Sequence, residues 1–404
     1  MPNRVHIRRA VIASFALYIV FGLPDGVFGT IWPNLRDDFG RSDASLGLLI
    51  LATALGYAVG GLTSGHLAER FTVGRLLPVT MTVAGIGLLT IGFAGDWRYV
   101  MLGYLVLGLA WGIADAAVNS WMAITQGPRQ MGLLHASYGV GAFAGPLLAT
   151  AFVADGTAWR APLVVCAALT AVSVVALVIA RSGFALATTT PEVAAKTTPA
   201  DGDDRLMVLM VVWFVVYAGI EVGLGSWVYT LLTEGRGYTD VSAGVITALY
   251  WGGIMAGRFV LAAFGNRTHP ERTLRATTMT VIASLLYLWI DIGGTGGLVM
   301  PLIGFALAPM FPVMIGRTGV YLGAARATKA VGYQIGATAI GFTSIPTLIG
   351  LLADRYDVGV AAPVVLATTL ALALIWITIE RGVIQSTGVV QEPAADDTPA
   401  PRRA

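Results

Sequence analysis

Charged residues are scarce in this sequence. Of its 404 residues, 25 are Lys or Arg and 23 are Asp or Glu, so charged side chains make up 12% of the chain. A soluble domain carries roughly a quarter charged residues, and half that fraction cannot cover a soluble particle of this size. The mean hydropathy of +0.75 and the 56% content of hydrophobic residues instead indicate segments that face lipid.

Cysteine and histidine are equally scarce. The single cysteine, Cys166, excludes a disulfide framework and a thiolate metal site, and the four histidines show no metal-site spacing. The sequence contains no Walker loop, no H-E-x-x-H pair and no dinucleotide fingerprint. The net charge of +2, without a dense basic stretch, argues against a nucleic-acid partner. We therefore expect no cofactor, no metal and no enzymatic or ATP-driven activity.

Long apolar runs recur along the whole chain. Each is about 20 residues long, the length of helix that crosses a hydrocarbon core. They predict an all-α integral membrane protein with twelve transmembrane helices, the first of which is too long for a signal peptide. The expected spans are 10–33, 45–67, 75–95, 99–125, 131–153, 160–181, 206–232, 242–264, 274–293, 297–316, 329–352 and 358–379.

The sequence between these runs predicts the organisation and orientation of the chain. An Ala-, Thr- and Pro-rich linker at 182–205 separates an N-terminal half, 1–181, from a C-terminal half, 206–384, and a disordered tail follows at 385–404. With the N-terminus placed inside, 19 of the 25 Lys and Arg residues, Arg258 among them, fall on the inner side and six on the outer side. By the positive-inside rule we expect a multi-pass protein of the cell (inner) membrane with both termini cytoplasmic.

An internal repeat relates the two halves. A constant shift of 197 positions aligns glycines of the first and second spans, and residues of the loops that follow them, with their counterparts in the seventh and eighth spans. Matched pairs include Gly22 with Gly219, Gly26 with Gly223, Gly56 with Gly253, Gly60 with Gly257 and Arg75 with Arg272. The repeat predicts two pseudo-symmetric six-helix bundles with a solute site near mid-membrane where they meet.

Acidic residues inside the spans are the strongest functional signals, because a charge at that depth is costly. Asp25 in the first span lies on a helical stripe with Tyr18, Phe21, Phe28 and Trp32, which suits stacking and hydrogen bonding of a polar ring. The alternative is an acid near the outer helix end that water satisfies.

Asp115 lies well inside the fourth predicted span. Trp111 and Asn119 share its helix face, and Asn119 is its i,i+4 neighbour. Desolvation disfavours the charged form of a carboxylate, which suits reversible protonation during transport. A structural hydrogen bond to a neighbouring helix is the alternative.

A third acid and several polar or aromatic side chains complete the predicted site. Glu221 follows Tyr217 by four residues and precedes two glycines, which suggests a bent helix. An outer acid met by water is again the alternative. His135 could relay protons or only pack. Further candidate cavity residues are Tyr138, Tyr250, Trp251, Tyr333 and Gln334. For the aromatic ones, packing or interface anchoring is the alternative.

The loop after the second span reads Gly65-His-Leu-Ala-Glu69-Arg70-Phe-Thr-Val-Gly74-Arg75. It resembles the cytoplasmic loop signature of the major facilitator superfamily, with altered spacing and with Glu69 in place of the usual Asp. We expect Glu69, Arg70 and Arg75 to form a charged latch that pairs differently in two access states. A plain positive-inside loop is the alternative.

Four phrases also resemble the fucose/galactose/glucose–proton symporter group of that superfamily. They are Gly22-x-x-Asp25-Gly26, Asp115-Ala-Ala-Val-Asn119, His135-Ala-Ser-Tyr-Gly-Val-Gly-Ala and Ala308-Pro-Met-Phe-Pro312. The resemblance implies proton coupling and sugar recognition by the acids of the first and fourth spans, here Asp25 and Asp115. The fourth-span acid of the fucose symporter looks to be Glu, so the shorter Asp115 could mean a different substrate.

Two transport functions fit these observations. The first is proton-coupled symport of a sugar, polyol or similar small polar solute by a monomer, with Asp115, Asp25 and Glu221 in coupling. The second is proton-driven efflux of a drug or metabolite, since Gly141-Ala-Phe-Ala-Gly145-Pro146 resembles an antiporter motif. Sodium coupling stays open. A receptor or scaffold would gain nothing from three buried acids.

Overall fold

The computed structural model describes residues 4–126, 128–154, 159–184, 204–264 and 269–387. The predicted linker and tail lie largely outside this range. Within it, twelve helical segments are long and apolar enough to cross a membrane, which confirms the predicted number of spans. The helices are α1 (Arg4–Asp38), α2 (Ser45–Phe71), α3 (Val73–Gly92), α4 (Trp97–Thr125), α5 (Pro128–Val153), α6 (Ala161–Ala180), α7 (Asp204–Thr233), α8 (Asp240–Phe264), α9 (Pro270–Ile290), α10 (Met300–Leu307), α11 (Met310–Leu322), α12 (Ala324–Arg355) and α13 (Ala361–Thr387).

The tenth span differs from the continuous helix that the sequence predicts. It consists of α10 and α11, which are separated by Ala308 and Pro309. Proline has no amide hydrogen and its ring clashes with the preceding turn, so the helical hydrogen bonding is interrupted here. The phrase Ala308-Pro-Met-Phe-Pro312 therefore marks a break inside a membrane span.

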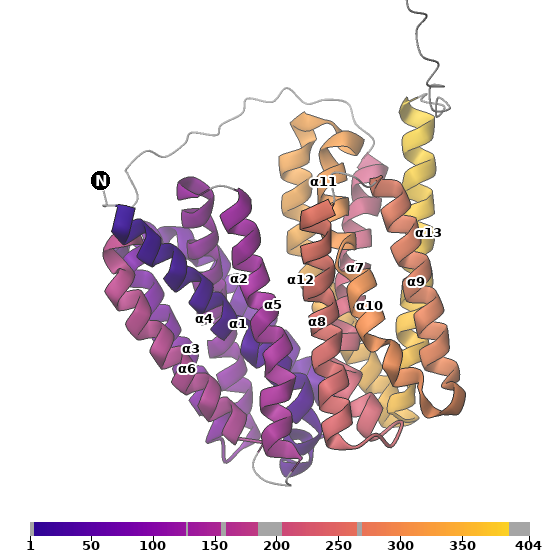
Figure 1. Cartoon of the computed structure of the whole chain (residues 1–404), viewed down its shortest axis with the longest axis horizontal. Helices are drawn as coiled ribbons and strands as arrows, with labels where there is room; N and C mark the ends of the chain where they lie inside the picture. Colours follow the sequence, from indigo (N-terminus) through magenta and orange to yellow (C-terminus); the bar gives the residue numbers. More distant parts are fainter. Residues whose placement is uncertain (1–3, 127, 155–158, 185–203, 265–268, 388–404) are drawn as a thin grey trace, which may run out of the picture.

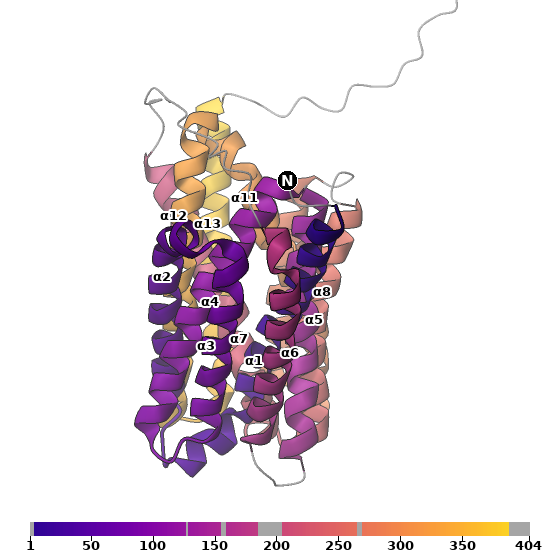
Figure 2. The ribbon, with the colours of Figure 1, turned by 90° about the vertical axis from the view of Figure 1, so that its left-hand side faces the viewer.

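The helices form two bundles of the same construction (Figure 1). In the first bundle α1 packs along α5 and α2 packs along α4, and in the second α7 packs along α12 and α8 along α10. The helix pairs α3 with α6 and α9 with α13 lie on the sides of their bundles that face away from the other bundle (Figures 1 and 2). This confirms the two pseudo-symmetric bundles.

Repeat-matched glycines explain why corresponding helices pair in both bundles. A Cβ built at Gly22 would lie 2.2 Å from the carbonyl oxygen of Tyr138, and one at Gly56 would lie 2.2 Å from that of Leu105. In the second bundle, a Cβ at Gly253 would lie 2.2 Å from the carbonyl oxygen of Pro301. Only glycine permits such close approach of two backbones, so the repeated glycines fix the repeated helix contacts.

Three helix pairs make most of the contacts between the two bundles. These are α5 with α8, α1 with α7 and α2 with α12. The helices of the first bundle are inclined relative to those of the second (Figure 1). Polar contacts between the bundles join the end of α1, the start of α2, the end of α7 and the end of α12, all at one end of the molecule.

Candidate functional site

Asp115 of α4 is the centre of a hydrogen-bonded cluster. Tyr18 Oη of α1 donates to Asp115 Oδ1 at 2.5 Å, and Tyr57 Oη of α2 donates to Asp115 Oδ2 at 2.6 Å. Asn119 Nδ2, one helical turn away, donates to Asp115 Oδ1 at 3.0 Å and to Tyr18 Oη at 2.7 Å. Both oxygens of this carboxylate therefore accept hydrogen bonds, and three helices converge on it.

The sequence analysis missed Tyr57. The residue reaches Asp115 because α2 and α4 nearly touch: a Cβ at Gly112 would lie 2.1 Å from the carbonyl oxygen of Tyr57. Tyr57 directly follows Gly56, one of the repeat-matched glycines. A tyrosine beside such a glycine in mid-span was therefore the available signal.

Asp25 is held by α5. Tyr138 Oη donates to Asp25 Oδ2 at 2.5 Å, so a hydroxyl from the neighbouring helix satisfies this acid. The ring of Phe21 contacts the tyrosine partners of both acids, with its centroid 5.8 Å from Tyr18 and 6.0 Å from Tyr138. It also lies 4.9 Å from the ring of Trp111. The structure thus brings Tyr18, Asp25, Trp111, Asp115, Asn119 and Tyr138 into one region of the first bundle.

His135 lies at the border of this region, whereas Phe28 and Trp32, the other members of the predicted aromatic stripe, lie outside it. The exposed imidazole of His135 meets the Tyr18 ring edge-on, with centroids 5.8 Å apart. Phe28 packs on Tyr104 at 4.5 Å, and Trp32 Nε1 donates to Asp43 at the far end of α1. The predicted aromatic stripe is therefore divided between the acid region and the end of the helix.

Glu221 has partners within the second bundle. Tyr217 Oη donates to its carboxylate, and Arg258 Nη2 of α8 lies 3.2 Å from Glu221 Oε1. Tyr250 Oη donates to the Glu221 carbonyl oxygen at 2.7 Å. Arg258 was counted above with the residues of the inner side. It lies inside α8, within the predicted span, and the structure adds that it pairs there with a membrane acid.

The other predicted residues of the second bundle have different surroundings. Trp251 is half-buried, with its ring centroid 5.4 Å from that of Tyr250, so it borders the Glu221 group. Gln334 is fully buried and its Oε1 accepts from Thr318 Oγ1 at 3.0 Å. No described contact joins Gln334 to the three acids, and Tyr333 is exposed beneath the ammonium group of Lys329.

The two acid groups approach each other at the seam between α5 and α8. A Cβ at Gly139 of α5 would lie 3.1 Å from Met255 Cγ of α8. Arg258 lies close enough to Tyr138 and His135 for its charge to act on both. The two bundles thus bring carboxylates, phenols, one guanidinium and indole rings near the α5–α8 seam, and these groups could bind a small polar molecule.

Comparison with known proteins decides the family. The sequence pattern of the Major Facilitator Superfamily matches residues 14–314. The chain belongs to this superfamily. It is therefore a twelve-span membrane transporter with sugar-transporter homologues, and not an enzyme.

Curated relatives and solved structures agree with this assignment. The chain is 23% identical to the sodium-dependent glucose transporter 1 of Homo sapiens, over 89% of this chain and 76% of that protein. It is 23% identical to a glucose/galactose transporter of Brucella abortus, over 87% and 89%. Its fold is similar to that of a bacterial homologue of the lysosomal transporter Spinster (TM-score 0.76, 14% identity, 95% and 98% coverage) and to that of the E. coli fucose:proton symporter FucP (0.61, 16%, 92% and 98%).

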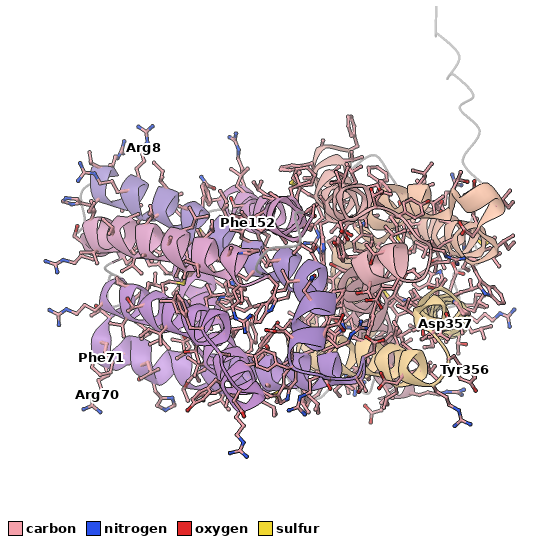
Figure 3. The ribbon with its side chains drawn as sticks, turned by 90° about the horizontal axis from the view of Figure 1, so that it is seen from below. Arg8, Arg70, Phe71, Phe152, Tyr356 and Asp357 are labelled. Atoms are coloured by element: carbon pink, nitrogen blue, oxygen red, sulfur yellow. The ribbon has the colours of Figure 1, made fainter. Side chains whose placement is uncertain are left out.

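The predicted latch of this transporter is not paired in the structure. Glu69, Arg70 and Arg75 are all exposed, and no described ion pair joins them. The Arg70 guanidinium lies 5.6 Å from the ring centroid of Phe71, at the edge of the first bundle (Figure 3). A pairing of Glu69 in another access state stays a prediction.

The transporter has a different set of ionic contacts at the opposite end. Arg36 at the end of α1 pairs with Glu234, which follows α7, at 2.8 Å and with Asp43 at 2.6 Å. Asp354 of α12 accepts hydrogen bonds from the backbone amides of Asp43 at 2.6 Å and Ala44 at 3.2 Å. Glu234 and Asp354 belong to the second bundle, so these contacts join the two bundles. The sequence analysis did not anticipate them.

Proposed function

We propose that this transporter is a proton-coupled symporter of a sugar, polyol or similar small polar solute, in the cell (inner) membrane with both termini cytoplasmic. The observation that carries the proposal is the environment of Asp115. Its carboxylate lies within a membrane span, accepts from two tyrosine hydroxyls and one amide, and has no ion-pair partner among the described residues. Such a group can take up and release a proton without leaving a cation unpaired.

The remaining groups suit solute binding. Asp25 with Tyr138, and Glu221 with Arg258, offer hydrogen-bond acceptors and donors from opposite bundles. The half-buried indole ring of Trp251 offers a flat apolar surface that suits the face of a sugar ring. Because Arg258 is already paired with Glu221, the site favours a neutral solute over an anion. The glucose-transporting relatives support a sugar.

The contacts between the bundles support transport by alternating access. The described polar contacts between bundles lie where α1 and α12 end, whereas the predicted latch at the other ends of α2 and α3 is unpaired. With the termini cytoplasmic, the transporter is closed on the outside. Rocking of the bundles would break the Arg36 and Asp354 contacts and would bring the latch together.

Proton-driven efflux is the second candidate function. The Gly141–Pro146 phrase that suggests it packs α5 against α1, since a Cβ at Gly141 would lie 2.0 Å from the carbonyl oxygen of Ile19. Gly341 gives the same close approach between α12 and α7, where a Cβ would lie 2.0 Å from the carbonyl oxygen of Val215. Because this close packing occurs in both bundles, helix packing alone explains the phrase, and the phrase does not favour efflux. We therefore prefer uptake.

The deciding experiment follows the external pH of a lightly buffered suspension of de-energised cells that express the protein. Sugars and polyols are added one at a time, with D-glucose first. Symport predicts alkalinisation with one solute and its loss in D115N, because the amide cannot carry the proton. D96N is the matched control, since Asp96 is an exposed residue that caps the start of the same helix. A silent panel would reject proton symport and leave sodium coupling or export.

A further inference from the structure

The two tyrosines on Asp115 have different freedom. Tyr18 is 1% exposed, and its hydroxyl both donates to Asp115 and accepts from Asn119. Tyr57 is 39% exposed, and Asp115 Oδ2 is the one described hydrogen-bond partner of its hydroxyl. The hydroxyl of Tyr57 can therefore turn without breaking a second hydrogen bond, while that of Tyr18 cannot.

This difference selects the oxygen of Asp115 that takes the proton. A carboxylate only accepts hydrogen bonds, but a carboxylic acid has one O–H group that must donate. A proton on Oδ1 would face both the Tyr18 hydroxyl and the Asn119 amide, which already donate to that oxygen. A proton on Oδ2 faces only the Tyr57 hydroxyl, which can turn from donor to acceptor.

Several charged and titratable groups lie near the Tyr57–Asp115 hydrogen bond, but none of those described forms an ion pair with Asp115. The charge of Asp25 on α1 acts on Tyr57 of α2. The charges of Asp115 on α4 and Arg258 on α8 act on His135 of α5. Arg258 itself is paired with Glu221. Because no described cation pairs with Asp115, protonation breaks no ion pair. Its structural effect is to reverse the direction of the Tyr57–Asp115 hydrogen bond.

We propose that Tyr57 is a positioning residue that links protonation of Asp115 to solute binding. The inference rests on the proposed symport. While Asp115 is ionised, Tyr57 donates to it. When a proton from the aqueous side binds Asp115 Oδ2, that O–H donates to Tyr57 Oη, and the Tyr57 O–H turns into the exposed space, where it donates to a hydroxyl oxygen of the solute. On the other side the solute leaves, the proton returns to water, and Tyr57 turns back.

The test separates coupling from transport in proteoliposomes that contain purified wild type, Y57F or Y99F. Tyr99 is an exposed tyrosine at the start of α4, so Y99F makes the same chemical change away from the site. The solute is the one that alkalinised the cell suspension, with radiolabelled D-glucose tried first. Counterflow without a pH gradient measures binding and bundle movement, and accumulation driven by an alkaline interior measures coupling.

We expect Y57F to weaken counterflow, because the solute loses one hydrogen bond, and to lower accumulation by about tenfold more than it lowers counterflow, because the link to the proton is lost as well. Y99F should match the wild type in both assays. Equal accumulation in Y57F and wild type would refute the link. Equal fractional losses of counterflow and accumulation in Y57F would also refute it, because Tyr57 would then act in binding or folding alone. Counterflow without accumulation in the wild type would instead overturn the proposed proton symport, and the inference with it.

Discussion

Asp354 offers the sharpest test of the access states, because it caps a helix of the other bundle. Its carboxylate accepts from the amides of Asp43 and Ala44, at 2.6 and 3.2 Å, at the start of α2. Hydrogen bonds to a charged group contribute about 1.5–3 kcal/mol, and a negative charge at a helix N-terminus adds about 0.3–1 kcal/mol. Asp354 is exposed, so solvent screening reduces the sum to about 1–2 kcal/mol.

The substitution D354A should therefore raise the ratio of outward-open to outward-closed molecules by about five- to thirtyfold, since about 1.4 kcal/mol is a factor of ten. The ratio can be measured by double electron–electron resonance between spin labels on R98C and L298C. Both sites are exposed, and they lie in different bundles at the end that carries Asp354. Because the sequence contains one cysteine, a C166A background leaves only the two labelled thiols.

The control for this experiment is D357A. Asp357 lies just beyond the same helix, but its carboxylate accepts from the amide of Gly359, two residues away in its own bundle. D357A should keep the distance distribution of the C166A background, and D354A should add a population at longer distance. If the two variants give the same distribution, Asp354 does not hold the bundles together and the reasoning fails.

Two further predictions concern helix packing and the Glu221 ion pair. G22A should lower the melting temperature of the purified protein by several degrees, because the new Cβ would overlap the backbone of α5 and overpacking costs about 1–3 kcal/mol. G61A is the control and should leave the melting temperature unchanged, because no atom lies within 4 Å of the Cβ built there. Equal melting temperatures for the two variants would contradict the packing argument. R258Q should reduce solute counterflow more than the double substitution E221Q/R258Q does, because the single change leaves the Glu221 carboxylate without its cation. If the loss in the double variant equals the sum of the losses in E221Q and R258Q, the two residues are not coupled.

Much of the fold could be predicted because span length and glycine spacing are local properties. A run of about 20 apolar residues identifies a span whatever surrounds it, and the shift of 197 aligned glycines that indeed lie at equivalent helix contacts. The break at Ala308 and Pro309 was not predicted, although both residues were quoted as part of a motif. Apolar composition continues across the break, so hydropathy does not register it.

The candidate site could be predicted only where its members share a helix or a stripe. Asp115 and Asn119 were grouped because they are one turn apart, and the structure joins them. The contacts of Tyr57 and Arg258 were not predicted because each residue reaches an acid on a different helix. Such contacts depend on how neighbouring helices are rotated about their axes. Arg258 was used only in the positive-inside count, which gives the side of the membrane on which a residue lies and not its partner.

The broken tenth span makes the duplicated bundles mechanically unequal. Its counterpart in the repeat is α4, an uninterrupted helix from Trp97 to Thr125 that carries Asp115 and Asn119. α10 packs on α8 and α9, whereas α11 packs on α12 and α9, so the two pieces of the tenth span rest on different supports. The uninterrupted α4 keeps Asp115 and Asn119 one helical turn apart. We therefore expect bending during transport to concentrate at Ala308 and Pro309 in the other copy.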